Sequence, residues 1–307
     1  MSLKRLRPLL HRRGEEEMPR ITMTKGPWFE SPAKINLRLE IIGKREDGYH
    51  ELRTIFQKIS LYDRLLFTLK KEKGISITTD QPGLPVGKRN LVYRAAQLMI
   101  ERSGFQGGIH IQIDKKIPLG AGLGGGSSNA ATTFKALNQL FEAKLNEKEL
   151  MILGKEVGAD VPFFFLKGAA IGYGIGEKLK EIRLPDLWYI LIYPNFEVST
   201  AWAYRNYVLT KRKFQINLHQ LPKRPEEVSK ILWNDLEEVV SKKFPQVFRM
   251  KEMLYSAGAE GALMTGSGPT VFGIFSKEKS AKEAFRKVEQ MAKGEGWSVL
   301  KAHNIPV

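Results

Sequence analysis

Residues 118–129 of this 307-residue chain read Pro118-Leu119-Gly120-Ala121-Gly122-Leu123-Gly124-Gly125-Gly126-Ser127-Ser128-Asn129. They join an alternating apolar segment to an amphipathic one. Glycine fills five of the seven positions 120–126. Because glycine has no Cβ, the backbone N–H groups of such a run can approach an anion closely. Residues 109–113 alternate as a strand does, and the apolar residues after the run recur at helical spacing. A helix that begins here points its positive end at the same place, so the arrangement predicts a phosphate-binding loop.

This glycine loop differs from the two common nucleotide motifs. No Gly-Lys-Ser or Gly-Lys-Thr follows it, as a Walker loop requires, and its glycines are too dense for a dinucleotide fingerprint. The last two serines could offer a hydroxyl to a phosphate or to Mg²⁺. The alternative interpretation is a flexible turn, or a close contact between a helix and a sheet. We expect a bound triphosphate, and we predict nucleotide contacts for Pro118, Leu119, Gly120, Ala121, Gly122, Leu123, Gly124, Gly125, Gly126, Ser127 and Ser128.

The periodicity along the chain predicts strands and helices in mixed order. Period-2 alternation between residues 33 and 113 is interrupted by one helix, which Asn90 caps and Gly104 ends. Further on, we expect strands at 187–193, 262–264, 271–275 and near 299, and helices at 247–255 and 281–291. This order predicts the α+β class in two parts, residues 28–184 and 185–307, after an extension of residues 1–27.

The composition excludes several classes of protein. The chain has no cysteine, which excludes a disulfide framework, a thiolate zinc site and a cysteine nucleophile. No apolar run approaches the about 18 residues that span a bilayer, and residues 1–18 lack the apolar stretch of a signal peptide. We therefore expect a cytoplasmic protein without a membrane partner.

The net charge of +16, from 49 Lys and Arg against 33 Asp and Glu, could indicate nucleic acid, an anionic membrane or phosphorylated small molecules. Residues 1–27 hold seven basic residues against three glutamates and look like a flexible tail, or like sequence upstream of a start at Met18 or Met23. Residues 205–251 hold eleven basic and five acidic residues, typical of a solvated helical surface or a binding patch. An RNA-binding protein therefore remains one alternative, although no nucleic-acid recognition motif supports it.

Two further segments, together with the glycine loop, carry a resemblance to a known family. Residues 31–37, Ser-Pro-Ala-Lys-Ile-Asn-Leu, and residues 265–270, Thr-Gly-Ser-Gly-Pro-Thr, resemble the first and third motifs of the GHMP kinases, and the loop resembles the second. The resemblance implies a ribosomal protein S5 domain 2-like N-terminal domain and a ferredoxin-like C-terminal domain. It also implies that ATP lies in the glycine loop and that the acceptor lies in the cleft between the domains.

Two more segments narrow the resemblance. Residues 43–52, Gly-Lys-Arg-Glu-Asp-Gly-Tyr-His-Glu-Leu, and residues 158–163, Gly-Ala-Asp-Val-Pro-Phe, resemble the members that use ATP to phosphorylate the C2 hydroxyl of 4-diphosphocytidyl-2-C-methyl-D-erythritol, in the non-mevalonate route to isoprenoid precursors. We therefore expect two small molecules as partners, ATP and a cytidine diphosphate polyol, and no nucleic acid. We expect the protein to be a monomer or a homodimer. A mevalonate-, homoserine- or galactose-type GHMP kinase is the other alternative.

The resemblance assigns the catalytic pair. Asp160 matches the catalytic base and Lys34 its partner, which suits a reaction that needs a carboxylate to accept the proton of the attacking hydroxyl. From the residues alone, Lys34 could equally be a lysine at a strand edge, and Asp160 could be a helix cap. Mg²⁺ is expected with ATP, but no residue here matches a metal-binding carboxylate of the family.

The resemblance also assigns residues that bind the two substrates. Tyr49 and His50 match positions that stack on and hydrogen-bond the cytosine, with Tyr204 as a second aromatic. Without the family, the Tyr-His pair would be an exposed surface feature. The remaining assignments are Asn36 and Thr200, to the phosphate or polyol of the acceptor, and Asn90, to the adenine or ribose of ATP.

Overall fold

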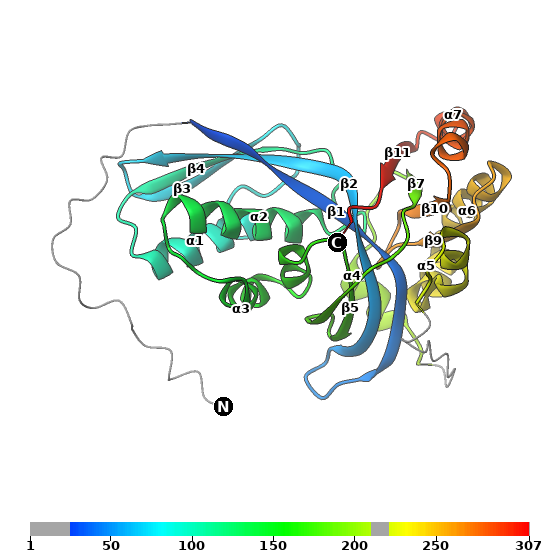
Figure 1. Ribbon diagram of the computed structural model, residues 1–307, viewed down its shortest axis with the longest axis horizontal. Helices are drawn as coiled ribbons and strands as arrows, with labels where there is room; N and C mark the ends of the chain where they lie inside the picture. The colour runs from blue at the N-terminus through cyan, green and yellow to red at the C-terminus, as the bar shows by residue number, and fades with distance from the viewer. Residues whose placement is uncertain (1–24, 210–220, 307) are drawn as a thin grey trace.

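A long antiparallel ribbon runs through the middle of the molecule (Figure 1). The computed structural model describes residues 25–209 and 221–306, and within them the strands form two sheets. Strands β1 (Lys25–Lys44) and β2 (His50–Lys70) make the ribbon. Its register shifts between Pro32 and Ala33, where proline has no N–H to give to the ladder. The strands therefore bend at this point, just before Lys34.

Strand β2 pairs with different strands along its two halves. Strand β4 (Gly108–Asp114) pairs with its C-terminal half, and β5 (Ala169–Gly174) pairs with its N-terminal half. The sheet is completed by β3 (Gly74–Thr79), parallel to β4, by β6 (Lys178–Ile182), beside β5, and by β8 (Trp233–Asn234), parallel to β1. β8 thus joins the first sheet although its residues lie in the second predicted part, 185–307.

The last three residues of the predicted N-terminal extension lie in strand β1. Strand β1 begins at Lys25, which pairs with Thr68, so residues 25–27 are part of the sheet. The rest of the predicted extension, residues 1–24, lies outside the described residues. The same holds for residues 210–220 of the predicted basic surface at 205–251.

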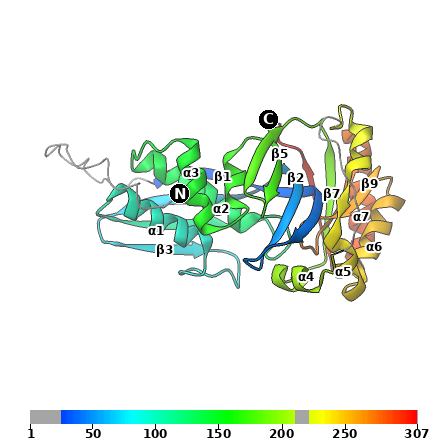
Figure 2. The same cartoon turned by 90° about the horizontal axis from the view of Figure 1, so that it is seen from below.

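Three helices pack together on one side of the first sheet (Figures 1 and 2). They are α1 (Leu91–Ser103), α2 (Gly125–Leu140) and α3 (Glu147–Val157). Asn90 Oδ1 accepts a hydrogen bond from Val92 N, and Gly104 takes a φ of +70° after the last turn, so the ends predicted for α1 are confirmed. The 3₁₀ helix η2 (Val161–Phe165) follows α3.

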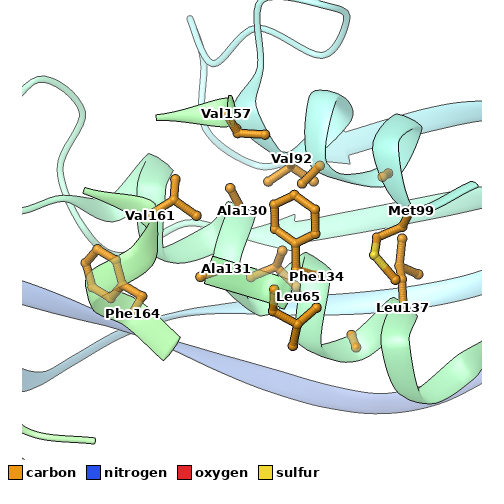
Figure 3. Packing of buried hydrophobic residues seen from close by; sticks show 14 of the residues in the cluster. Leu65, Val92, Met99, Ala130, Ala131, Phe134, Leu137, Val157, Val161 and Phe164 are labelled. Carbon is orange, nitrogen blue, oxygen red and sulfur yellow. The ribbon is translucent and has the colours of Figure 1, made fainter. Parts of the chain in front are cut away.

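Phe134 of α2 lies at the centre of the core beneath these helices (Figure 3). Figure 3 shows it surrounded by side chains from four elements: Val92 of α1, Leu65 of β2, Val157 of α3, and Ala131 of α2 itself. Its ring is fully buried. This core fixes α2, and with it the glycine loop that leads into the helix, against the ribbon.

The second sheet has the strand order β11 (Ser298–His303), β7 (Trp188–Tyr193), β10 (Val271–Phe275) and β9 (Gly261–Met264), all antiparallel. Helices α6 (Gln246–Ser256) and α7 (Glu278–Lys293) pack on one face of this sheet (Figure 2). With the helices between them, these strands run β-α-β-β-α-β in sequence with the first and last strands adjacent, which is the ferredoxin-like arrangement.

The other face of the second sheet packs against the ribbon. Tyr189 and Phe272 of this sheet share one buried cluster with Ile35 and Leu37 of β1. Between β7 and α6 the chain forms α4 (Thr200–Asn206), η4 (Pro225–Ile231) and α5 (Asp235–Lys243). The predicted α+β class, with two parts of mixed helices and strands, is confirmed.

We expect Phe134→Ala to lower the free energy of unfolding by about 3–5 kcal/mol, because it removes a fully buried ring and leaves a cavity. Urea unfolding followed by circular dichroism measures this loss. Phe248→Ala is the matched control, since that ring is 54% exposed on α6, and it should stay within about 0.5 kcal/mol of the parent protein. Equal losses for the two variants would contradict the central place of Phe134 in the core.

Candidate active site

A cavity of about 860 Å³ opens between the glycine loop, the ribbon and α4. This volume lies in the usual range for a site that holds a small molecule. The predicted site residues in its wall are Lys34, Asn36, Tyr49, His50, Pro118, Leu119, Gly120, Ala121, Gly122, Leu123, Gly124, Gly125, Gly126, Ser127, Asp160, Thr200 and Tyr204. Segments that are far apart in the sequence therefore meet at one cavity.

The glycine loop packs tightly against the third motif. Gly120, Gly122 and Gly124 have φ values of +58°, +79° and +69°, a conformation that residues with a Cβ rarely adopt. A Cβ at Gly122 would lie 2.5 Å from the carbonyl oxygen of Thr265. Glycine is therefore needed here both for the turn and for the close approach of the two loops.

Helix α2 begins within the glycine run and not after it. Its first residue is Gly125, and Ser128 N already donates to the carbonyl of Gly124. The N–H groups without a partner inside the helix thus belong to Gly125, Gly126 and Ser127. These donors, at the positive end of α2, form the part of the cavity best suited to an anion.

Lys34 and Asp160 form an ion pair in the cavity wall. Lys34 Nζ lies 3.5 Å from Asp160 Oδ2, with the lysine side chain 5% exposed and the aspartate side chain 34% exposed. The ammonium also donates to Asn36 Oδ1 at 2.6 Å and lies 5.5 Å from the centre of the Phe56 ring. The pair is therefore buried at its cation and open to the cavity at its carboxylate.

Strand β1 ties this pair to both loops. Lys34 N donates to the carbonyl of Leu123 at 3.0 Å, in the glycine loop. Asn36 N donates to Thr265 Oγ1 at 2.9 Å, in the third motif, and Asn36 Nδ2 donates to Thr54 Oγ1 at 2.8 Å. The position of the ammonium is thus fixed relative to the glycine loop and to the third motif.

Aromatic residues also line the cavity. The rings of His50 and Tyr204 are 5.3 Å apart at 31°, so they contact each other, and a base between them would have to separate them. Tyr49 is 60% exposed and lines the cavity. Burial, with a smaller contribution from Lys44, lowers the pKa of His50, which favours the neutral ring.

Thr200 of α4 and the third motif contact each other in the cavity wall. Thr200 Oγ1 lies 2.8 Å from Ser267 Oγ, which also lines the cavity. Burial, followed by the nearby Asp160 carboxylate, raises the pKa of Tyr204, so its hydroxyl stays protonated. The two hydroxyls and the phenol provide neutral hydrogen-bonding groups beside the ion pair.

Two of the predicted contact residues lie outside the lining of this cavity. Asn90 caps α1, and its Nδ2 donates to the carbonyl of Pro85 at 2.6 Å. Ser128 is fully buried, and its Oγ accepts a hydrogen bond from Ser31 Oγ at 2.8 Å. Helix α2 starts early enough to turn the Ser128 hydroxyl toward β1 and away from the cavity, and the nucleotide contact of Ser128 stays a prediction. The nucleotide contact of Asn90 stays a prediction.

Sequence reasoning missed a buried ion pair beneath the start of α2. Lys115 Nζ lies 2.7 Å from Asp63 Oδ2, and Asp63 Oδ1 accepts from the backbone N–H groups of Lys116 and Ile117. Lys115 lines the cavity, and a Cβ at Gly125 would lie 3.0 Å from its Nζ. No periodicity could indicate this pair, since its members are 52 residues apart.

Arg205, Ser267 and Phe56 also line the cavity without having been predicted. Arg205 adjoins the predicted Tyr204, and Ser267 lies within the third motif, so both were close to a signal in the sequence.

Acidic residues are scarce in this wall. Asp160 is the one carboxylate among the described lining residues. The described part of the chain holds no group of three or more His, Cys, Asp or Glu residues that could bind a metal by itself. A cation here would need most of its ligands from elsewhere, such as phosphates and water.

Among the described helices, none is long and apolar enough to cross a membrane.

Two family models match the chain. The N-terminal domain of the GHMP kinases matches residues 90–168, and the C-terminal domain of the GHMP kinases matches residues 216–294. The first match contains the glycine loop and Asp160, and the second contains the third motif.

Relatives are similar over most of the chain. The 4-diphosphocytidyl-2-C-methyl-D-erythritol kinase of Syntrophotalea carbinolica is 44% identical over 270 residues, which is 88% of this chain and 95% of that protein. The kinase of the same name from Syntrophus aciditrophicus is 49% identical over 259 residues, 83% of this chain and 91% of that protein.

Solved structures have the same fold. A 4-(cytidine 5'-diphospho)-2C-methyl-D-erythritol kinase superposes with a TM-score of 0.75 at 33% identity, over 92% of this chain and 100% of that one. The homoserine kinase from Cytophaga hutchinsonii has a TM-score of 0.70 at 22% identity, over 91% of this chain and 94% of that one, and shows the fold alone. The glycine loop, the third motif and these similarities place the chain in the GHMP kinase family, among the 4-diphosphocytidyl-2-C-methyl-D-erythritol kinases.

Proposed function

We propose that this protein transfers the γ-phosphoryl group of ATP to the C2 hydroxyl of 4-diphosphocytidyl-2-C-methyl-D-erythritol, as a step of the non-mevalonate route to isoprenoid precursors. The observation that carries the proposal is the place of the Lys34–Asp160 pair. It lies in one cavity with the positive end of α2 and with the aromatic residues Tyr49, His50 and Tyr204. One cavity thus offers a site for phosphates, a base for a hydroxyl and rings for a cytosine.

The transfer needs a base and a cation at the attacking hydroxyl. Asp160 accepts the proton of the C2 hydroxyl as its oxygen forms a bond to the γ-phosphorus. The bond between that phosphorus and the oxygen bridging to the β-phosphate breaks, and ADP leaves. The Lys34 ammonium, 3.5 Å from the carboxylate, stabilises negative charge on the attacking oxygen.

The nucleotide phosphates would lie against the start of α2. The free N–H groups of Gly125, Gly126 and Ser127 supply donors there, and the helix end supplies positive potential. Mg²⁺ would be held here mainly by phosphates and water, with Ser127 Oγ as a protein ligand. When bound, it would neutralise charge on the phosphates.

The acceptor would lie against the aromatic residues of the cavity. Tyr49 and Tyr204 offer faces for the cytosine, and the neutral His50 ring has both a donor and an acceptor nitrogen. Asn36 and Thr200, in the same wall, are proposed to contact the phosphate or the polyol. The cytoplasmic location, the monomer or homodimer, and the absence of a nucleic-acid partner stay predictions.

ADP release with a panel of acceptors tests the proposed function. We expect turnover with 4-diphosphocytidyl-2-C-methyl-D-erythritol and none above background with mevalonate, homoserine or galactose. Tyr49→Ala should weaken use of the cytidine acceptor through its KM, because it removes an exposed ring that can stack on the base. Turnover of one of the other acceptors instead would show a GHMP kinase of another specificity, and salt-sensitive binding of RNA without turnover would support the RNA-binding alternative.

Asp160→Asn should reduce kcat by about 10²–10⁴-fold, because the amide cannot accept the proton of the hydroxyl. ATP binding, measured by isothermal titration calorimetry, should stay near the parent value, since the glycine loop keeps its shape. Turnover within a few-fold of the parent enzyme would show that Asp160 is not the general base.

Lys34→Ala should lower kcat by on the order of 100-fold while the KM for the acceptor changes little, because its charge acts mainly in the transition state. Steady-state kinetics measure both values. Lys148→Ala, an exposed lysine on α3, is the matched control and should leave both unchanged. A rise in KM with an unchanged kcat would make Lys34 a residue for binding only.

A further inference from the structure

We propose that Lys58 is a positioning residue for Asp160, which it holds in place through the opposite end of helix η2. The proposal rests on the role of Asp160 as the base. Helix η2 begins directly after Asp160 and ends at Phe165. Its short length means that fixing its last carbonyl groups also fixes the residue at its start.

Lys34 and Lys58 are direct neighbours across the ribbon. In the antiparallel register of β1 and β2, Lys34 lies opposite Lys58. Side chains at opposite positions of such a pair emerge on the same face of the sheet. The Lys34 ammonium contacts Asp160 at the start of η2, and the Lys58 ammonium contacts the carbonyl groups at its end. Two adjacent positions of the ribbon therefore hold the two ends of one short helix.

The contacts at the C-terminal end of η2 come from two lysines. Lys58 Nζ donates to the carbonyl of Phe164 at 3.1 Å and to that of Leu166. Lys135 Nζ, from α2, donates to the carbonyl of Phe164 at 3.0 Å and to that of Phe165 at 3.4 Å. The last carbonyls of a helix lack partners in a following turn, and cations there are favourable.

Burial of the Lys58 ammonium is costly. The residue is 4% exposed, and burial followed by repulsion from Lys135 lowers its pKa to about 7, against a weaker opposing effect of Glu181 and Glu147. No salt bridge joins Lys58 to a carboxylate within residues 25–209 and 221–306. A buried apolar side chain would be easier to accommodate than this charge. The ammonium instead contacts backbone carbonyl groups, which indicates that it holds the backbone of η2 in position.

The apolar side of η2 has separate support. Val161 and Phe164 of η2 belong to the core cluster that also contains Ala130 and Ala131 of α2 (Figure 3). The Lys58 ammonium lies 5.9 Å from the centre of the Phe164 ring. Packing holds the helix on α2, and the lysine contacts fix its carbonyl groups. Loss of Lys58 should therefore shift Asp160 without unfolding η2.

Steady-state kinetics of Lys58→Met test the proposal, because methionine keeps the apolar stem and removes the donor. We expect kcat to fall by about 10–100-fold, with the KM values of ATP and acceptor little changed, since a small displacement of the base is enough. In an Asp160→Asn background, Lys58→Met should cause no further loss, because its effect passes through Asp160. Exposed Lys148→Met is the matched control, expected to leave kcat unchanged.

Several outcomes would overturn the role of Lys58. An unchanged kcat in Lys58→Met would do so, and so would an equal loss in the Asp160→Asn background, which would mark a general structural role. If Lys58→Met does not fold, Lys58→Leu serves instead, because leucine also removes the donor to both carbonyl groups and suits a buried position. A normal kcat in that variant would then contradict the proposal. Near-normal turnover of Asp160→Asn alone would contradict only the proposed base.

Discussion

The burial of one ammonium group, that of Lys34, is the constraint on which the site depends. A buried charge requires polar groups that replace its hydration, and Lys34 finds them in Asp160 and Asn36. These two partners belong to different parts of the molecule, because Asp160 directly precedes η2 and the backbone of Asn36 binds Thr265 of the third motif. Satisfying one charge thus gathers the ribbon, the carboxylate and the third motif at one side of the cavity.

The two sheets give the Lys34 ammonium and its partners a rigid support. The core around Phe134 fixes α2 on one side of the ribbon, and the cluster with Tyr189 and Phe272 fixes the second sheet on the other. The core around Phe134 fixes the start of α2, which is the proposed phosphate-binding part of the cavity. Thr200 and Tyr204 come instead from the chain segment after β7. The two substrates would therefore meet where the two halves of the molecule join, with the ion pair between them.

Local signals in the sequence predicted much of this fold. Asn90 and Gly104 marked both ends of α1, and the glycine run marked the loop before α2. Interactions between distant residues were missed, because no periodicity indicates them: the Lys115–Asp63 pair, the contacts of Lys58 with η2, and the pairing of β8 with β1. The burial of the Ser128 hydroxyl could not be predicted for a related reason, since it depends on where α2 begins within the glycine run and not on the residue itself.

A crystal structure of the protein with a non-hydrolysable ATP analogue and 4-diphosphocytidyl-2-C-methyl-D-erythritol would show whether the Lys34–Asp160 pair lies between the two substrates. We expect the γ-phosphate to lie at the start of α2. We also expect the C2 hydroxyl to lie within hydrogen-bonding distance of the Asp160 carboxylate, beside the Lys34 ammonium, with the cytosine against Tyr49, His50 and Tyr204. A nucleotide bound away from the glycine loop, or a C2 hydroxyl out of reach of Asp160 while both ligands are ordered, would contradict this arrangement.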